Sequence, residues 1–449
     1  MPNFIKSEKL FLIFLFAFNF LFRLFRIQAP AESFLNEKYY ILPAARDILL
    51  GFGDTKPITP PSPLGKLLFA SSIKLFGDNP FGWRILPVLF TAALVILTYF
   101  LAKEIFKNRA IATTAGILLT FEAALFVHSR SADPEVFLVT FIILSMIFVW
   151  KVCSENKLIW TVSAGVSSGL ALTIKPQASL AIVAGLVTIL FLAKEKLRSR
   201  ILSTFLILII SSFIYLIAYL PVFQKSGISG YILLHQNIKQ YHTQYWPENY
   251  YKVMSQSEYG PRLPQFNQYL RYPITWLKNP KILYFEKGID SKKRLVLFTF
   301  NPMIFFPAIG AFLFGLVLAI NRRDLRIVFL LLTASFFYFP YLFSSLYKPL
   351  TYPPYYLLSS FPLLIILLSY LLDFVRKKAR FIFIVYLVLV VVTFAAYYPL
   401  LAALPVTYDY FHFLTGLKSG PLKISEKIVT SMLEGGLIPS ITLLSIVIE

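Results

Sequence analysis

Residues 88–101 read Val-Leu-Phe-Thr-Ala-Ala-Leu-Val-Ile-Leu-Thr-Tyr-Phe-Leu, and residues 381–394 read Phe-Ile-Phe-Ile-Val-Tyr-Leu-Val-Leu-Val-Val-Val-Thr-Phe. Both runs are apolar on every face, so neither alternates as the strand of a membrane barrel does. Crossing roughly 30 Å of hydrocarbon takes about 20 apolar residues in a helix. A backbone in lipid must also satisfy its own hydrogen bonds. These runs therefore predict membrane-spanning helices.

The composition extends this prediction to the whole chain. Of its 449 residues, 57% are hydrophobic and 14% charged, which leaves too little polar surface for a water-soluble globule. We predict an all-α polytopic membrane protein that forms a single membrane domain over residues 1–449. The predicted spans are 9–27, 83–102, 110–127, 134–152, 158–173, 177–193, 201–221, 297–319, 327–346, 354–374 and 381–402. The tail 403–449 is open between a further span and a surface helix.

The net charge of +21 reflects topology rather than nucleic-acid binding, because the basic residues lie in the gaps between spans. They follow alternate spans, as Lys103, Lys107 and Arg109; Lys151 and Lys157; Lys194, Lys196, Arg198 and Arg200; Arg322, Arg323 and Arg326; and Arg376, Lys377, Lys378 and Arg380. Basic loops stay in the cytoplasm. The N-terminus is therefore predicted to be cytoplasmic and the long polar loops extracytoplasmic.

Several chemistries lack support in the sequence. Cys153 is the single cysteine, so neither an intramolecular disulfide nor a thiolate metal cluster can form within the chain. No glycine-rich phosphate loop of the Walker or Rossmann type is present, which removes support for ATP-driven transport and nicotinamide chemistry. A divalent ion is compatible with the sequence, but no ligand cluster requires one. A transporter has only the many spans in its favour.

The predicted topology collects polar residues on the extracytoplasmic face. They lie in the first outer loop 28–82, in the turn 128–135, at the bend after residue 174 and in the large outer loop 222–296. Within the first loop, the periodicity of 37–50 and 64–76 predicts two amphipathic helices along the membrane. The candidate catalytic residues are Asn36 and Glu37, and the candidate substrate-binding residues are Arg130, Lys175, Glu135, His235 and His242.

The charges of these residues suggest a division of labour. A carboxylate at Glu37 or Glu135 can take a proton or orient a polar acceptor, whereas Arg130 and Lys175 can hold a phosphate. Plainer interpretations stay open at this point. Glu37 is equally typical of a solvated loop, and the two cations are equally typical of side chains reaching to headgroups. The histidines are equally consistent with loop packing.

A series of motifs recurs along the chain in a characteristic order. They are Asn36-Glu37, Pro61-Ser62-Pro63-Leu64-Gly65-Lys66, Phe76-Gly77, Gly82-Trp83-Arg84, Ser129-Arg130-Ser131-Ala132-Asp133-Pro134-Glu135, Ile174-Lys175, the segment from His235 to His242, Asn301-Pro302, Tyr397-Tyr398-Pro399-Leu400 and Leu404-Pro405. Their order and spacing resemble those of the protein O-mannosyltransferases, glycosyltransferase family 39 of the GT-C class. The likeness runs through most of the chain.

This resemblance implies a GT-C fold with about 11 transmembrane helices and amphipathic helices in the first outer loop. It also implies transfer of a sugar, usually mannose, from a polyprenyl phosphate to a Ser or Thr hydroxyl of a secreted or membrane protein, with inversion at the anomeric carbon. The partners are then the lipid-linked donor, the acceptor and membrane lipid. A loop carboxylate would be the base, and Arg130 and Lys175 would stabilise the departing phosphate. An oligomer is compatible with the sequence.

The chain also departs from the family pattern. The position of the base aspartate is Asn36, and an amide cannot take the proton. Glu37 or Glu32 would then serve, or the acceptor is a lipid or cell-envelope glycan, or the chain is a non-catalytic homologue. Glu135 stands for an aspartate, and Tyr355 for a histidine of a late span. The large soluble insert of eukaryotic members is missing, which favours a compact form from a prokaryotic plasma membrane.

Overall fold

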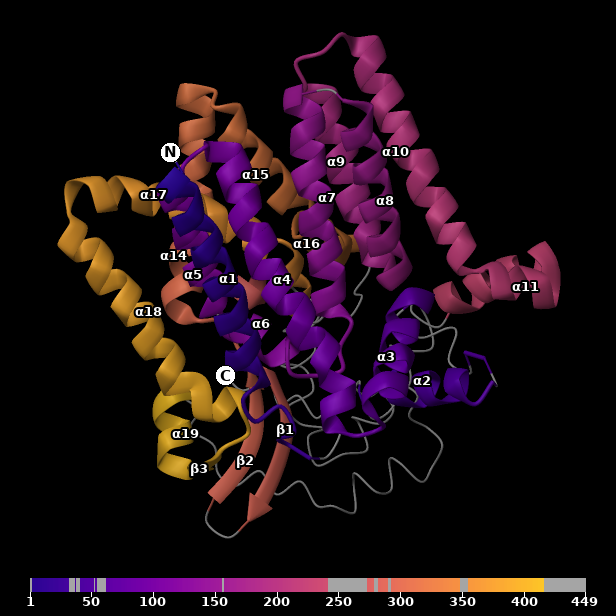
Figure 1. Cartoon of the computed structure of the whole chain (residues 1–449), viewed down its shortest axis with the longest axis horizontal. Coiled ribbons are helices and arrows are strands. Elements are labelled where there is room, and N and C mark those ends of the chain that lie inside the picture. The colour runs from indigo at the N-terminus through magenta and orange to yellow at the C-terminus, as the bar shows by residue number, and fades with distance from the viewer. Residues whose placement is uncertain are drawn as a thin grey trace.

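The computed structural model describes residues 2–31, 37, 41–51, 53–54, 62–155, 157–240, 273–277, 282–289, 292–347 and 354–415. Helices dominate these residues (Figure 1). The longer helices are α1 (Pro2–Leu24), α2 (Leu42–Leu49), α3 (Pro63–Phe76), α4 (Pro80–Phe106), α5 (Arg109–Thr120), α6 (Ala123–His128), α7 (Glu135–Glu155), α8 (Leu158–Ile174), α9 (Ser179–Leu192), α10 (Leu197–Ala218), α11 (Leu220–Gln240), α14 (Pro302–Arg322), α15 (Leu325–Phe336), α16 (Phe339–Tyr347), α17 (Phe361–Lys378), α18 (Arg380–Leu401) and α19 (Tyr408–Thr415).

The predicted membrane protein is confirmed. Among the described residues, five helices are long and apolar enough to cross a bilayer, namely α4, α7, α10, α14 and α18. A sixth candidate is the pair α15 and α16, bent by 41°. The remaining predicted spans correspond to α1, to the shorter apolar helices α5, α8 and α9, and to α17. The exact number of spans stays a prediction.

Capping side chains determine where several helices begin. Asn79, Asn108, Asn301 and Asp324 precede α4, α5, α14 and α15, and the side chain of each accepts a hydrogen bond from a backbone N–H of the first turn. Such caps satisfy donors that the helix itself leaves without partners. The caps therefore define where these helices begin. Helices α4 and α14 also have a proline in their first turn, which favours a helix start.

The third predicted span, 110–127, is broken rather than continuous. Helix α5 ends at Thr120 and α6 begins at Ala123. Between them, Glu122 caps α6 by accepting a hydrogen bond from the backbone N–H of Leu125 at 2.7 Å. This carboxylate is fully buried, and a buried charge in an apolar run needs such partners. The break therefore follows from one acidic residue.

A small sheet accompanies the predicted helices. Strands β1 (Ile282–Ile289), β2 (Lys292–Phe298) and β3 (Pro405–Thr407) form an antiparallel sheet in the order β1-β2-β3. Residues 297 and 298 were predicted to open the eighth span, but they end β2, and α14 begins at Pro302. A short apolar run such as 295–298 does not distinguish a strand from a helix.

The sheet, α2, α3 and α19 gather at one end of the bundle, at the bottom of Figure 1. The two amphipathic helices predicted in the first loop are α2 and α3 of this group. Helix α7 lies inside the bundle, because 72% of an apolar 18-residue stretch of this helix is buried. In the corresponding stretch of α18, 17% is buried. The exposed apolar side chains of α18 and α10 therefore face outward, where lipid surrounds an integral membrane protein.

Candidate active site

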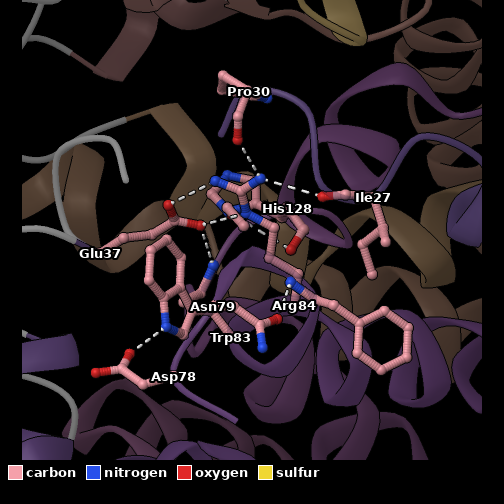
Figure 2. Close-up of polar contacts among 11 residues, drawn as sticks. Ile27, Pro30, Glu37, Asp78, Asn79, Trp83, Arg84 and His128 are labelled. Carbon is pink, nitrogen blue, oxygen red and sulfur yellow. Dashed lines mark hydrogen bonds and ion pairs between the residues drawn. The ribbon is translucent and has the colours of Figure 1, made fainter. Parts of the chain in front are cut away.

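Glu37 and Arg84 form a buried ion pair at this end of the bundle (Figure 2). The Nε of Arg84 donates to Oε1 of Glu37 at 3.1 Å, and Nη2 donates to Oε2 at 3.0 Å. The same guanidinium donates through Nη1 to the backbone carbonyls of Ile27 and Pro30, at 3.1 and 2.7 Å. Arg84 is 0% and Glu37 1% exposed. Arg84 thus fastens the chain that follows α1 to the first turns of α4.

Glu37 also contacts the turn that leads into α7. Its Oε1 accepts a hydrogen bond from the backbone N–H of Ala132 at 2.6 Å. Both carboxylate oxygens are therefore engaged by donors, one of them a guanidinium. Such contacts occupy the acceptor sites of the carboxylate and fix its orientation. The catalytic role of Glu37 stays a prediction, and the geometry favours an anchoring role.

The helices of the first loop are held to α4 and to each other by further polar contacts. Asp78 accepts hydrogen bonds from Trp83 Nε1 at 2.6 Å and from Arg46 Nε at 2.7 Å, which joins α2 to the start of α4. Lys66 on α3 is 1% exposed and lies 2.7 Å from a carboxylate oxygen of Asp54. These pairs keep α2 and α3 in place over the end of the bundle.

A second ionic cluster lies on the other side of the 129–134 turn. Lys175, directly after α8, donates through Nζ to Oε1 of Glu135 at the start of α7. The same ammonium lies over the rings of Tyr355 and Tyr356, 5.4 and 4.7 Å from their centroids. These tyrosines belong to the short helix η6 (Pro354–Ser359). Aromatic faces stabilise a buried cation, so Lys175 has three favourable neighbours here.

Asp133 and His128 extend this cluster. His128 Nδ1 lies 3.2 Å from Oδ2 of Asp133, and the imidazole packs between the rings of Phe298 and Tyr355. Burial alone would raise the pKa of Asp133, but the charge of His128, its hydrogen bond and Lys175 more than offset this and hold the pKa below its ordinary value. The Asp133 carboxyl is therefore ionised at neutral pH.

Arg130, within the 129–134 turn, contacts different residues from Lys175. Its Nη2 donates to the backbone carbonyl of Arg26, and its guanidinium lies 5.2 Å from the centroid of the Phe126 ring. Its Nη1 is buried and has no hydrogen-bond partner among the residues described. Burial lowers the pKa of Arg130 to about 10, helped by the charges of Arg84 and Arg26, so the group stays protonated at neutral pH. The structure thus does not bring Arg130 and Lys175 together as one cationic pair.

The remaining predicted site residues are only partly described. His235 lies on α11, where Nε2 is 2.9 Å from the hydroxyl of Tyr215 and Nδ1 is 3.0 Å from the carbonyl oxygen of Tyr231. His242 and Asn36 lie outside the described residues, as does Glu32. Within the part of the chain that the structure describes, no group of three or more His, Cys, Asp or Glu side chains is placed to hold a metal ion.

Part of the chain matches a known protein family. Residues 57–223 match the family model described as dolichyl-phosphate-mannose-protein mannosyltransferase. This segment contains Lys66, Arg84, Arg130, Glu135 and Lys175. Over this segment, which is less than half of the 449 residues, the chain is similar to the protein O-mannosyltransferase family.

Curated proteins match the chain over a short segment. A polyprenol-phosphate-mannose–protein mannosyltransferase of Mycobacterium tuberculosis is 35% identical over 81 residues, which are 18% of this chain and 16% of the relative. Its counterpart from Mycolicibacterium smegmatis is 37% identical over 79 residues, or 18% and 15%. The matched segment therefore spans less than a fifth of the length of these relatives.

Solved structures confirm the GT-C fold. The chain resembles a chain of the S. cerevisiae protein O-mannosyltransferase Pmt1-Pmt2 complex bound to the sugar donor, with a TM-score of 0.75, 12% identity and 93% of each chain covered. It also resembles ArnT from Cupriavidus metallidurans bound to undecaprenyl phosphate, with a TM-score of 0.57, 13% identity, and 96% of this chain and 74% of ArnT covered. At such identities the likeness concerns the fold.

Three features of the candidate site were missed by sequence reasoning. The partnership of Arg84 with Glu37 had a signal in the motif Gly82-Trp83-Arg84, since an arginine that opens a span needs a partner. The pairing of His128 with Asp133 had a weaker one, because an aspartate before a proline is also typical of a helix start. Asp133 does accept a hydrogen bond from the backbone N–H of Glu135 at 3.3 Å. The tyrosines over Lys175 had none.

Proposed function

We propose that this chain is an inverting glycosyltransferase. It moves a sugar, mannose by family likeness, from a polyprenyl phosphate to a Ser or Thr hydroxyl of a secreted or membrane protein. The observation that carries the proposal is the family match over residues 57–223, because that segment supplies most of the ionic residues gathered at one end of the bundle. This end faces the outside of a prokaryotic plasma membrane, with the N-terminus in the cytoplasm.

Arg130 is the proposed phosphate-binding residue. Its buried Nη1 is a strong donor without a partner among the described residues, which is costly unless a ligand completes it. A guanidinium suits the oxygens of a phosphate, and burial strengthens the attraction. Arg26 and Arg84 add positive potential at the same place. These charges would stabilise the lipid phosphate as it leaves.

Lys175 and Glu37 take supporting roles in this proposal. Lys175 forms its ion pair with Glu135, and its role in this proposal is to hold that carboxylate in place. Glu37 accepts a hydrogen bond from the backbone N–H of Ala132 and thereby anchors its own position of the first outer loop to the turn. No nucleotide takes part. A divalent ion is not required by any described group of ligands.

The residue Asn36 favours a second candidate function. An amide at the position of the family's base aspartate fits a homologue that binds the lipid carrier without transferring its sugar. An enzyme that glycosylates a lipid or a cell-envelope glycan shares the donor chemistry of the first proposal and differs only in the acceptor.

The test is sugar transfer by the purified chain in proteoliposomes, from labelled polyprenyl-phosphate mannose to a Ser/Thr-rich peptide. The native chain is expected to transfer mannose. Arg130→Gln should weaken donor binding by about tenfold or more, the loss of one charge-assisted hydrogen bond. Arg46→Gln, at a surface ion pair, is the matched control and should bind the donor as the native chain does.

The outcomes separate the candidate functions. Binding of donor without transfer to any acceptor, together with activity gained in Asn36→Asp, would favour the carrier-binding homologue. Transfer to lipid or glycan but not to peptide would replace the acceptor class. A native chain that neither binds the donor nor transfers sugar would refute the proposal.

A further inference from the structure

Glu135 carries a buried carboxylate oxygen without a hydrogen-bond partner. Among the described residues, Oε2 of Glu135 is the only carboxylate oxygen in this condition. The side chain is 1% exposed, and its other oxygen accepts a hydrogen bond from Lys175. An acceptor atom buried in this way costs free energy unless a donor reaches it. The hydroxyl of an acceptor substrate is a hydrogen-bond donor that would satisfy this oxygen.

Other described carboxylates near the turn have their oxygens engaged. Glu37 accepts from Arg84 on both oxygens and from the backbone N–H of Ala132. Asp133 contacts His128 and accepts from the backbone N–H of Glu135. Asp54 contacts Lys66. The residue before Glu37 in the sequence is Asn36, whose amide takes no proton under ordinary conditions. Glu135 is therefore the carboxylate best placed to accept one.

The surroundings of Glu135 tolerate its protonation. When Glu135 becomes neutral, Lys175 loses an ionised partner but keeps the faces of Tyr355 and Tyr356 and the nearby charge of Asp133. A buried ammonium with these neighbours stays compensated. The hydrogen bond from Lys175 to Oε1 meanwhile holds the carboxyl group in one orientation. The site thus combines a fixed carboxylate with a proton-accepting oxygen.

We propose that Glu135 is the general base of this chain, in place of the aspartate absent at position 36; this inference rests on the proposed function. The acceptor hydroxyl gives its proton to Oε2 of Glu135, and its oxygen forms the new bond to the anomeric carbon. The bond from that carbon to the phosphate oxygen breaks, and its electron pair leaves with the polyprenyl phosphate. No further reactant is needed. Lys175 is a positioning residue in this step.

An aspartate introduced at position 36 offers a test of Glu135 as the base. Glu37 is hydrogen-bonded to Ala132, which precedes Glu135 by three residues. An aspartate at position 36 would restore the carboxylate that the family pattern has there. If Glu135 acts as the base, an aspartate at position 36 should compensate for its loss, whereas it should not repair a defect in packing.

The experiment compares native chain, Glu135→Gln, Glu135→Asp and the double variant Glu135→Gln/Asn36→Asp in proteoliposomes, with Glu155→Gln as control. Glu155 ends the same helix far from the turn, and its ion pair with Lys157 is exposed. Transfer is measured as kcat and KM against pH, and donor binding with unlabelled polyprenyl phosphate. Thermal unfolding in detergent reports whether each variant folds.

Glu135→Gln is expected to lower kcat by about 10²–10⁴-fold, the usual contribution of a general base, while polyprenyl phosphate binds within a few-fold of native. Glu135→Asp should keep part of the activity with an altered acid limb of the pH profile. The double variant should recover at least about tenfold in kcat. Glu155→Gln should match native.

Three results would overturn the inference. They are a kcat of Glu135→Gln within a few-fold of native, a loss of activity that parallels a loss of polyprenyl phosphate binding, or a pH profile of Glu135→Asp identical to native. If Glu135→Gln fails to fold, Glu135→Asp and the double variant decide the matter. A native chain that transfers sugar although Glu135 is dispensable refutes this inference alone. A native chain without transfer refutes the proposed function as well.

Discussion

Arg84 and Glu37, 47 positions apart in the sequence, are joined by two hydrogen bonds in an ion pair that solvent does not reach. Removing two charges from water is expensive, and their attraction compensates only when the remaining donors and acceptors are also satisfied. That condition is met here, because Ile27, Pro30 and Ala132 supply backbone partners. The pair therefore ties α1, the first outer loop, α4 and the turn before α7 into one unit.

Arg84→Met should destabilise the fold strongly. It leaves the Glu37 carboxylate buried without its guanidinium, and breaking a buried pair in this way costs about 3–5 kcal/mol. Loss of the anchor should also release the loop that carries Asn36 and reduce transfer. The measurement is the midpoint of thermal unfolding of purified protein in detergent, alongside the transfer assay.

The matched control is Arg46→Met. Arg46 also forms an ion pair with an aspartate, Asp78, but both side chains are about two-fifths exposed, and such a pair contributes about 1 kcal/mol or less. An equal loss of stability in the two variants would contradict the anchoring role of Arg84.

The break between α5 and α6 leads to a second prediction. Glu122 caps α6 and also accepts a hydrogen bond from the backbone N–H of Asn301 at 3.1 Å, which ties α14 to the break. Glu122→Ala should lose the cap, about 1 kcal/mol, and leave a buried N–H unsatisfied, about 1–3 kcal/mol. Thermal unfolding of the variant measures the sum.

Asp324→Ala provides the comparison for Glu122, since Asp324 caps α15 and pairs with the neighbouring Arg326 but has no described hydrogen bond to another helix. The Glu122 variant should be the less stable of the two. Equal midpoints would mean that the contact with Asn301 adds nothing.

The spans were predictable from sequence because apolar runs of this length have few alternatives in any protein. Details within them were not. Glu122 interrupts an apolar run once, and a single charge does not reveal whether a helix breaks or carries the charge onward. Residues 295–298 are apolar like the start of a span, and only their pairing with β1 makes them a strand.

The sequence indicated candidate site residues but not which of them contact one another. The turn 128–135 drew attention because its charges lie between apolar runs. Its pairings depend on tertiary contacts that local spacing does not encode. Lys175 was predicted to bind phosphate beside Arg130, but it pairs with Glu135 while Arg130 contacts Arg26 and Phe126. The division of the two cations between separate sets of contacts was not foreseen, and their phosphate-binding role stays a prediction.

The pair of His128 and Asp133 predicts a pH dependence of stability. The folded pKa of Asp133 lies below its ordinary value, which is about 3.9. Its contribution to stability is therefore fully present above pH of about 3.9 and is lost as pH falls through the lower folded value. Removing the imidazole in His128→Asn leaves burial to raise the pKa, so acid unfolding should begin at higher pH.

The measurement for this pair is the thermal midpoint between about pH 3 and 7 in native protein and in His128→Asn. His235→Asn is the control, because His235 contacts Tyr215 and the backbone of Tyr231 and forms no ion pair with a carboxylate among the described residues. Acid transitions of native protein and His128→Asn that coincide would show that the imidazole does not stabilise the Asp133 carboxylate.

The orientation of the chain in the membrane is the last prediction. The basic loops place the connection between α7 and α8 in the cytoplasm and α3 outside. Lys157 and Lys74 are exposed representatives of the two sides, and the native Cys153 is buried, which keeps background labelling low. A membrane-impermeant maleimide should label Lys74→Cys on intact cells and Lys157→Cys only after permeabilisation. The reverse pattern would invert the topology and would put the Glu37, Arg130 and Glu135 clusters on the cytoplasmic side, where an extracytoplasmic acceptor cannot reach them.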